Sequence, residues 1–537
     1  MRSAEKKRSS SCRFADRVAL LSIEFYQLHC PTDIKREMKQ TVIASFVVQY
    51  PADDTGTGGQ DGTDDDVMHA QHIDEPRLQS RLQVTSLGVG TKVLPAHMVE
   101  LHDEKGDRVR DMHAEVLARR GFNRFLYGQI ELFLASQGSD ISDRRGELGS
   151  RCIFSREEGS DLLVLRQGIT VHMYTSSAPC GNATIKRWAK PAVLPFREDL
   201  SADEYDVKYS HPRIHFSARH EGQTALLVKT NNHGSSSRTI DGDACPVTRA
   251  AIFTAPGTAA TDTGLGNVMT CSDKIAGWSA LGVQGALLAG MLAPVYLSSI
   301  TIGRKFSLPH CCRALCCRLQ DFHFCSSFSS SSGEDSAVPD SVQEWRTHHP
   351  VLLGTQIKLD NGAIETAPGS EGIDSLVGAQ FLEKRGLCCY VDNMSGQLAK
   401  GGGDSTAVAC EVLDSSTGLL LSRSYGGCID TDAQASSVST SALFHLYRCL
   451  FPKYLRICTS NVAVLPWIRM YAGECLNETT LDAEAIMGRL NYRQYKRMGR
   501  CLHYSKAKDM LRRDPLLLGG WVRKRAKQQI PSTVGEI

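Results

Sequence analysis

The chain has 537 residues, of which 42% are hydrophobic and 22% are charged, and its formal net charge at pH 7 is +2. This composition is typical of a globular protein with a large core and excludes a mostly disordered or collagen-like chain. The small net charge favours no class of partner, because segments of opposite sign cancel in it.

The first part of the chain predicts a helical segment that precedes the main domain. Apolar residues at helical spacing predict helix over 13–49. An acidic, Gly-rich stretch at 52–75 predicts a disordered insertion. We therefore set the boundary of this N-terminal segment at residues 1–80 and that of the main domain at 81–537.

The main domain begins with alternating strands and helices. The predicted elements, in order, are a strand with a turn at 82–94, an amphipathic helix at 113–135 with Asp111 as its N-cap, a strand at 171–177, a helix after Cys271 and a strand at 295–303. This succession predicts an α/β layered core.

Two insertions and a basic tail complete the domain. Residues 200–262 predict a long connection with little regular structure, and residues 325–345 a Ser-rich insertion. Residues 346–537 alternate short strands with basic helices.

The apolar stretch Trp278–Leu297 has the length of a membrane span, but it contains Gln284 and lacks flanking anchors. We therefore expect a buried core helix that runs into a strand, and no membrane partner.

The cysteines and the N-terminus indicate a compartment inside the cell. Adjacent pairs such as Cys388-Cys389 are typical of free thiols in a reducing environment rather than of a disulfide framework. The basic N-terminus has no apolar segment of the secretory type. We expect a location in the cytoplasm or the nucleus.

Three short motifs carry the candidate chemistry. His113-Ala-Glu115 opens a helix, Pro179-Cys180 follows a strand, and Cys271 precedes another helix. In zinc deaminases, an H-x-E element supplies one metal ligand and a carboxylate that moves protons, and cysteines complete the site. One His and two Cys leave the fourth zinc position free for water, whose pKa falls to about 7 on the metal. Taken singly, each residue is more readily explained as an ordinary core histidine, surface carboxylate or buried thiol.

Taken together, the motifs resemble the adenosine-deaminase domain shared by tRNA-specific and double-stranded-RNA adenosine deaminases. The resemblance covers about residues 80 to 525, with interruptions. It is carried by SLGVGTK (86–92), DMHAEVLARRGFNRFLY (111–127), SAPCGNA (177–183), MTCSDKIAGWSALGVQGALL (269–288), HCCRALCCRL (310–319) and YSKAKDML…GGWVRK (504–524). It implies a cytidine-deaminase-like core, a mixed sheet with helices on both faces, with a basic helical C-terminal part.

By this resemblance, His113, Cys180 and Cys271 bind Zn²⁺, Glu115 is the proton shuttle, and Thr91 and Lys92 contact the RNA. The implied reaction is hydrolysis of adenosine to inosine in RNA. The blocks resemble most the tRNA branch, which acts on adenosine 37, next to the anticodon of alanine tRNA. The alternatives are editing of double-stranded or messenger RNA, and a non-catalytic RNA-binding relative. No DNA partner is implied.

The family also buries inositol hexakisphosphate in a basic cavity. The matching positions here are Arg119, Arg120, Lys274, Tyr504, Lys508, Trp521 and Lys524. Gly277, Ala286 and TAPGT at 254–258 depart from the family pattern, which weakens the expectation of full inositol-phosphate occupancy and of one RNA contact. The cysteines at 311–317, with His310, His323 and Cys325, suggest a second zinc site, but their match to an ordinary family helix favours a plain helix.

Overall fold

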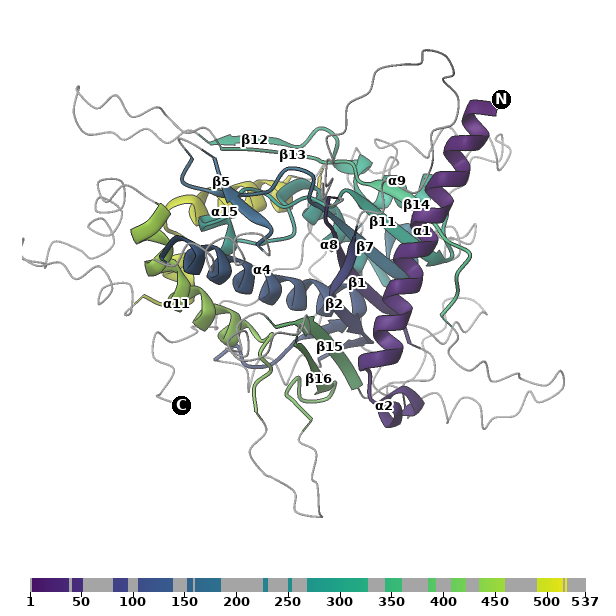
Figure 1. The fold of residues 1–537 in the computed structure, drawn as a ribbon, viewed down its shortest axis with the longest axis horizontal. Helices are drawn as coiled ribbons and strands as arrows, with labels where there is room; N and C mark the ends of the chain where they lie inside the picture. The colour runs from purple at the N-terminus through teal and green to yellow at the C-terminus, as the bar shows by residue number, and fades with distance from the viewer. Residues whose placement is uncertain are drawn as a thin grey trace, which may run out of the picture.

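The fold is organised around one mixed sheet (Figure 1). The computed structural model describes residues 2–37, 41–51, 81–94, 105–138, 152–157, 160–184, 226–229, 250–253, 268–326, 343–359, 385–392, 407–421, 434–458, 490–514 and 517–518. Seven strands of these residues form the sheet, in the spatial order β14 (Val351–Gly354), β11 (Ser299–Arg304), β7 (Thr170–Ser177), β1 (Ile43–Gln49), β2 (Leu82–Val89), β15 (Arg385–Val391) and β16 (Val408–Asp414). Strand β11 is parallel to β7 and β14, and the other pairs are antiparallel, so the predicted mixed sheet is confirmed.

Helices and short strand pairs surround the sheet. The helices are α1 (Arg2–His29), α2 (Thr32–Glu37), α4 (Ala114–Gly138), α8 (Cys271–Leu281), α9 (Leu308–Leu315), α11 (Thr440–Cys458), α14 (Tyr492–Tyr495) and α15 (Gly499–Arg513), with 3-10 turns η1 (Asn182–Thr184), η2 (Leu288–Gly290) and η3 (Cys317–Leu319). The small strands are β3 (Thr91–Val93), β4 (Asp111–His113), β5 (Phe154–Arg156), β6 (Leu163–Leu165), β8 (Leu226–Lys229), β9 (Ala250–Phe253), β10 (Val268–Met269), β12 (His323–Ser326) and β13 (Gln343–Arg346).

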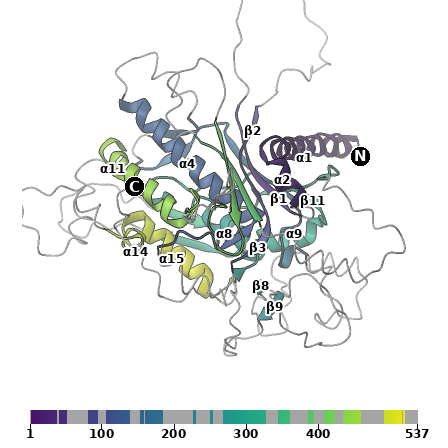
Figure 2. The ribbon, with the colours of Figure 1, turned by 90° about the horizontal axis from the view of Figure 1, so that it is seen from below.

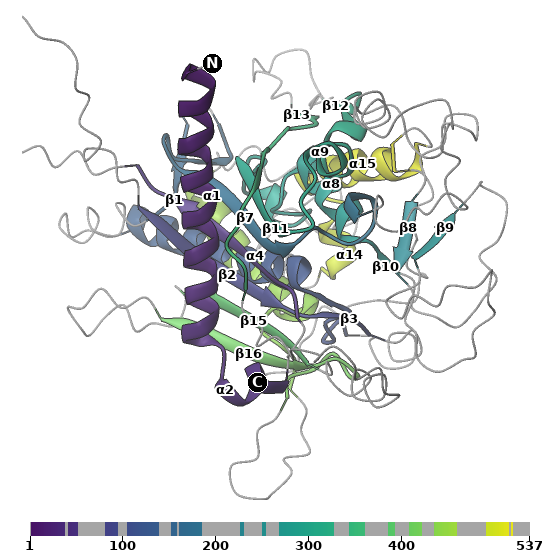
Figure 3. The ribbon, with the colours of Figure 1, turned by 90° about the vertical axis from the view of Figure 1, so that its right-hand side faces the viewer.

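Helices cover both faces of the sheet, as predicted. Figures 2 and 3 show α1 crossing the strands on one side, and Figure 2 shows α4 on the other. Successive side chains of β1 point to opposite faces of the sheet. Val47 packs in one core cluster with Val18 of α1, whereas Phe46 stacks on Phe122 of α4 with ring centroids 4.6 Å apart. This alternation follows from the two-residue repeat of a strand.

The start of α4 lies very close to β2, and a glycine makes that approach possible. A Cβ added at Gly88 would lie 2.2 Å from the carbonyl oxygen of Ala114 and 2.4 Å from the backbone nitrogen of Ala118. Because these are backbone atoms, no side-chain movement could relieve the clash. Gly88 therefore sets the position of the first turn of α4, which carries Glu115.

The prediction of helix over 13–49 is right for its first part and wrong for 43–49. Those residues form β1, which pairs with β2 on one side and β7 on the other. The seven-residue strand is buried on both faces, so its sequence IASFVVQ lacks the polar alternation that marks a half-exposed strand. The main sheet thus includes residues that precede position 81.

The apolar stretch after Cys271 is also more broken than predicted. Helix α8 ends at Leu281, where Gly282 has φ +79°, and the chain continues into η2 before β11. No helix in the described ranges combines the length and the apolarity that crossing a membrane requires.

The remaining expectations are confirmed where the structure describes the chain. The strands at 82–94 and 171–177 and the helix after Asp111 are present as β2–β3, β7 and α4, whereas the segment 310–319 is divided between the end of α9 and the 3-10 turn η3. Within the 200–262 connection, β8 and β9 form an antiparallel pair. The insertion at 52–75, the middle of 325–345 and TAPGT at 254–258 lie outside the described residues. The cysteines whose side chains the structure describes, from Cys30 to Cys501, are free thiols.

Candidate functional site

Asp111 and His113 lie on the short strand that leads into α4. Strand β4 pairs with β3, which places Thr91 opposite His113. The Asp111 carboxylate accepts a hydrogen bond from the His113 backbone N–H at 3.0 Å, and its Oδ1 lies 2.7 Å from Nδ1 of the same residue. An imidazole that donates Nδ1–H to a carboxylate keeps the Nε2 lone pair for a metal. Asp111 is not the predicted N-cap, because α4 begins at Ala114; it orients the histidine instead.

Glu115 and Cys271 come from the first turns of two different helices and meet in the core. Glu115 is 4% exposed, and Cys271, the first residue of α8, is fully buried. The Cys271 thiol donates to Glu115 Oε2 at 3.1 Å across 156 residues of sequence. The fold therefore brings the predicted proton shuttle and one predicted metal ligand into direct contact.

Cys180 joins this group from the end of β7. Its Sγ accepts the backbone N–H of Cys271 at 3.4 Å. That N–H belongs to the N-terminus of α8, where unsatisfied donors and the helix dipole favour a thiolate. Ser272 fastens the two cysteine segments, since its N–H donates to the Cys180 carbonyl at 3.0 Å and its hydroxyl donates to the Pro179 carbonyl at 3.1 Å.

The turn after Cys180 requires a glycine. Gly181 has φ +101°, and a Cβ there would lie 2.2 Å from Thr270 Oγ1. This contact brings the residue after one cysteine against the residue before the other. Both the positive φ and the short distance exclude a larger side chain.

A buried ion pair supports the start of α8. Arg318 Nη2 lies 2.7 Å from Asp273 Oδ1, and neither side chain is exposed to solvent. Asp273 also accepts hydrogen bonds from Asn182 Nδ2 at 3.2 Å and from Thr270 Oγ1 at 2.5 Å. Arg313 donates to the Asn182 carbonyl at 3.4 Å. Two arginines of the α9–η3 region thus hold the segments that follow Cys180 and Cys271.

The donor set fits zinc. An oriented imidazole and two thiols, one buried and one half-buried at a helix N-terminus, are the ligand types of catalytic zinc sites, which keep a fourth position for water. The Glu115 carboxylate beside Cys271 is placed to exchange protons there. Sequence reasoning gave Asp111 the role of an N-cap rather than that of a histidine partner. It assigned no role to Arg313 and Arg318, because no local pattern connects them with segments far away in the chain.

Thr91 and Lys92, predicted to contact RNA, are both half-buried on β3. Thr91 pairs with His113, and Lys92 pairs with Met112. The β3–β4 pairing therefore places this predicted loop directly beside the histidine.

The predicted inositol-phosphate positions do not all gather in one place. The Arg119 guanidinium lies 5.2 Å from the centre of the Trp278 ring, and burial lowers its pKa. Tyr504 is buried, and Lys508 Nζ lies 5.8 Å from its ring centre. Arg512, which sequence reasoning missed, has its pKa lowered to about 10 by burial, and the charge of Arg119 adds to this effect.

The side chains of Arg120 and Lys274 bind other parts of the protein. Arg120 donates to the Val438 carbonyl at 2.6 Å, and the Lys274 ammonium pairs with the Asp111 carboxylate. A Cβ at Gly277 would meet nothing within 4 Å, and Ala286 packs against a hydrophobic cluster. Trp521 and Lys524 lie outside the described residues.

Comparison with known proteins gives one family. The model of the adenosine-deaminase (editase) domain matches residues 86–354. The chain is similar to the double-stranded RNA-specific adenosine deaminase of Mus musculus, with 32% identity over 239 residues, 44% of this chain and 17% of that protein. It is similar to the double-stranded RNA-specific editase B2 of Rattus norvegicus, with 31% identity over 61% of this chain and 39% of that protein. It is also similar to tRNA-specific adenosine deaminase 1 of Homo sapiens, with 28% identity over 57% of this chain and 69% of that protein. The chain thus spans less than a fifth of the mouse enzyme and about two thirds of the human one.

Proposed function

Because this chain belongs to the adenosine-deaminase (editase) domain family, we propose that it converts adenosine to inosine in RNA by hydrolysis at a zinc site. The proposed ligands are His113, Cys180 and Cys271, and the proposed proton shuttle is Glu115. The observation that carries this proposal is the contact of Cys271 with both Glu115 and Cys180. His113, whose ring is fixed by Asp111, precedes Glu115 by two residues.

In the proposed reaction, Glu115 transfers the protons and the zinc ligands hold the metal. Bound zinc would supply a water whose pKa is about 7, and hence a nucleophile at neutral pH. Glu115 takes a proton from the attacking water and delivers it to the base. Oxygen becomes bonded to C6 of the adenine, the amino group leaves as ammonia, and the base left in the RNA is hypoxanthine. Burial of Glu115 excludes bulk water from these proton transfers.

For the substrate we propose tRNA, at adenosine 37 next to the anticodon of alanine tRNA. The support is the alignment with the human tRNA-specific enzyme, which covers the larger share of that relative. The second candidate is double-stranded or messenger RNA, favoured by the higher identity to the mouse enzyme. Either substrate implies a location in the cytoplasm or the nucleus, which fluorescence microscopy of the tagged chain would test.

The test incubates the full chain with an alanine tRNA transcript and with a long RNA duplex, and maps inosine by sequencing. We expect inosine at position 37 of the tRNA. Glu115→Ala should retain zinc and lose inosine formation by about 100-fold or more, the usual size of a general acid–base contribution. Inosine made at an undiminished rate by Glu115→Ala would contradict the mechanism, and inosine in neither RNA would favour a non-catalytic RNA-binding relative.

We further propose that inositol hexakisphosphate binds near Arg119, Tyr504 and Arg512. The support is that the charge of Arg119 acts on half-buried Arg512 beside Tyr504, and phosphates buried in a fold need such cations for neutralisation. Denaturing the purified protein in acid and measuring released inositol phosphate by mass spectrometry tests this. Release of none from an otherwise active protein would contradict it.

A further inference from the structure

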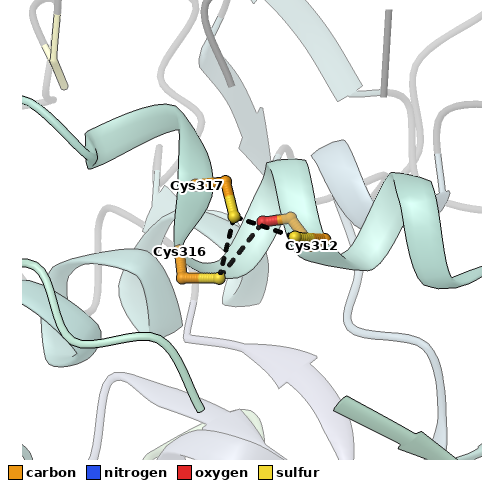
Figure 4. A group of neighbouring side chains, drawn as sticks. All are labelled: Cys312, Cys316 and Cys317. Carbon is orange, nitrogen blue, oxygen red and sulfur yellow. Dashed lines mark hydrogen bonds between the residues drawn. The ribbon is translucent and has the colours of Figure 1, made fainter. Parts of the chain in front are cut away.

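Three sulfur atoms that are not among the proposed catalytic ligands converge where α9 ends. Figure 4 shows the side chains of Cys312, Cys316 and Cys317 pointing toward one another. Their Sγ atoms lie within 4.8 Å of one another. The Cys316–Cys317 distance is 3.6 Å, and the Cys312–Cys317 distance is 2.8 Å. The helix predicted at 310–319 is present only as far as Leu315, and the change to the 3-10 turn η3 after it gathers the thiols.

A fourth donor comes from a distant part of the chain. His349 lies between β13 and β14, and its Nδ1 is 3.5 Å from Cys317 Sγ. Neighbouring contacts fix this segment: the Thr347 hydroxyl donates to the Leu319 carbonyl, and the His348 N–H donates to the Ser279 carbonyl at 2.8 Å. The imidazole is thus held beside Cys317 by contacts of neighbouring residues that do not depend on it.

Two of the distances between these donors are those of a zinc site. With Zn–S near 2.3 Å and Zn–N near 2.1 Å, a tetrahedral ion places sulfurs about 3.8 Å apart and sulfur and nitrogen about 3.5 Å apart. The Cys316–Cys317 and Cys317–His349 distances match these values. Cys312 Sγ must move away from Cys317 by about 1 Å, which a small χ1 rotation provides.

We infer that Cys312, Cys316, Cys317 and His349 bind a second zinc ion. Four protein ligands close the coordination sphere, which is the character of a structural rather than a hydrolytic site. Cys316 and Cys317 are 1% and 6% exposed, so the ion lies within the fold, and the exposed His349 gives it access from solvent.

The position of the second zinc site indicates that it supports the first site. Arg313 and Arg318 lie on either side of Cys316 and Cys317, and they hold the Asn182 carbonyl and the Asp273 carboxylate. These partners follow Cys180 and Cys271 by two residues. An ion that clamps the end of α9 therefore fixes the two arginines that position the segments of the first site.

Zinc binding to the full chain, demetallated and kept reduced, tests the inference. We expect two equivalents of zinc per chain in the unmodified protein, measured by mass spectrometry of the metal. Cys317→Ser and His349→Ala should each lose one equivalent, and with Co²⁺ Cys317→Ser should lose part of the thiolate charge-transfer absorption. His349 is exposed, so its replacement leaves folding intact. The exposed Cys325→Ser and His348→Ala are matched controls and should keep both equivalents.

The outcomes separate this inference from the proposed function. Zinc content in Cys317→Ser and His349→Ala equal to that of the unmodified protein would overturn the second site. So would peptide mapping of the protein purified without reductant that finds Cys312 joined to Cys317 by a disulfide. If the proposed catalytic site instead fails, the unmodified protein would hold one equivalent of zinc. His113→Ala would leave that equivalent in place, and Cys317→Ser would remove it.

Discussion

Replacing Arg318 with Met tests whether the buried ion pair supports the candidate site. Methionine keeps an unbranched apolar stem and removes the guanidinium. Asp273, which is fully buried, would lose its partner at 2.7 Å and keep only the bonds from Asn182 and Thr270. The substitution therefore leaves a buried carboxylate without a cation, which destabilises the folded state.

The structure sets the size of the effect. Breaking a buried ion pair costs about 3–5 kcal/mol. Two hydrogen bonds to Asp273 survive, and Nε and Nη1 of Arg318 have no hydrogen-bond partner among the described residues, so their removal relieves a desolvation cost. Both features point to the lower end, about 3 kcal/mol. Arg313→Met is the matched control: its contact at 3.4 Å with a neutral carbonyl should cost about 1 kcal/mol.

Equilibrium unfolding in urea measures the change, and a double-mutant cycle with Asp273→Asn isolates the pair. Because Asp273→Asn removes the charge that Arg318→Met leaves uncompensated, the double variant should be more stable than the sum of the single effects predicts, by at least about 1 kcal/mol. A coupling below about 0.5 kcal/mol, or an Arg318→Met variant no less stable than Arg313→Met, would refute the reasoning.

Three further predictions follow from the same structure. Asp111→Asn should weaken zinc binding at the His113 site by about 10- to 100-fold in a chelator competition assay, because the ring of His113 loses a charged partner; unchanged affinity would contradict the orienting role. Gly88→Ala should lower the free energy of unfolding by about 3 kcal/mol, because its Cβ would meet two backbone atoms, whereas Gly277→Ala, with open space around it, should not lower it. Burial lowers the pKa of His172 to about 4, below its unfolded value, so His172 should cause a loss of stability as the pH falls from about 6.5 to about 4, by up to about 3 kcal/mol. His172→Gln should remove that part of the pH dependence, and identical pH profiles for the two proteins would contradict the assignment.

The sequence predicted the layered core and the helices and strands that carry the site motifs, because amphipathic patterns and short motifs are local. The helix of Glu115 and the strand before Cys180 lie where their residue patterns indicate. Strand β1 was missed because both its faces are buried, and a continuous apolar run does not distinguish strand from helix.

The missing parts of the candidate site depend on contacts between distant segments. Arg318 follows two cysteines in a short helical stretch, and nothing nearby in sequence connects it with Asp273, 45 residues earlier. Likewise, the spacing of the cysteines shows that they share one end of α9, but His349 joins them only through the packing of the β13–β14 segment against α8 and η3.

The central place of β1 also has a consequence for how the chain is synthesised. The backbone N–H of Ile43 donates to the hydroxyl of Ser176, a residue made 133 positions later. At roughly 5–20 residues per second, translation leaves the β7 side of β1 without its partner for on the order of ten seconds. During that interval an apolar strand presents an open edge, the kind of surface that recruits chaperones or aggregates. The strands beside it wait longer still, because β7 needs β11 (Ser299–Arg304) and β2 needs β15 (Arg385–Val391), so the edges of the growing sheet are covered from β1 outward.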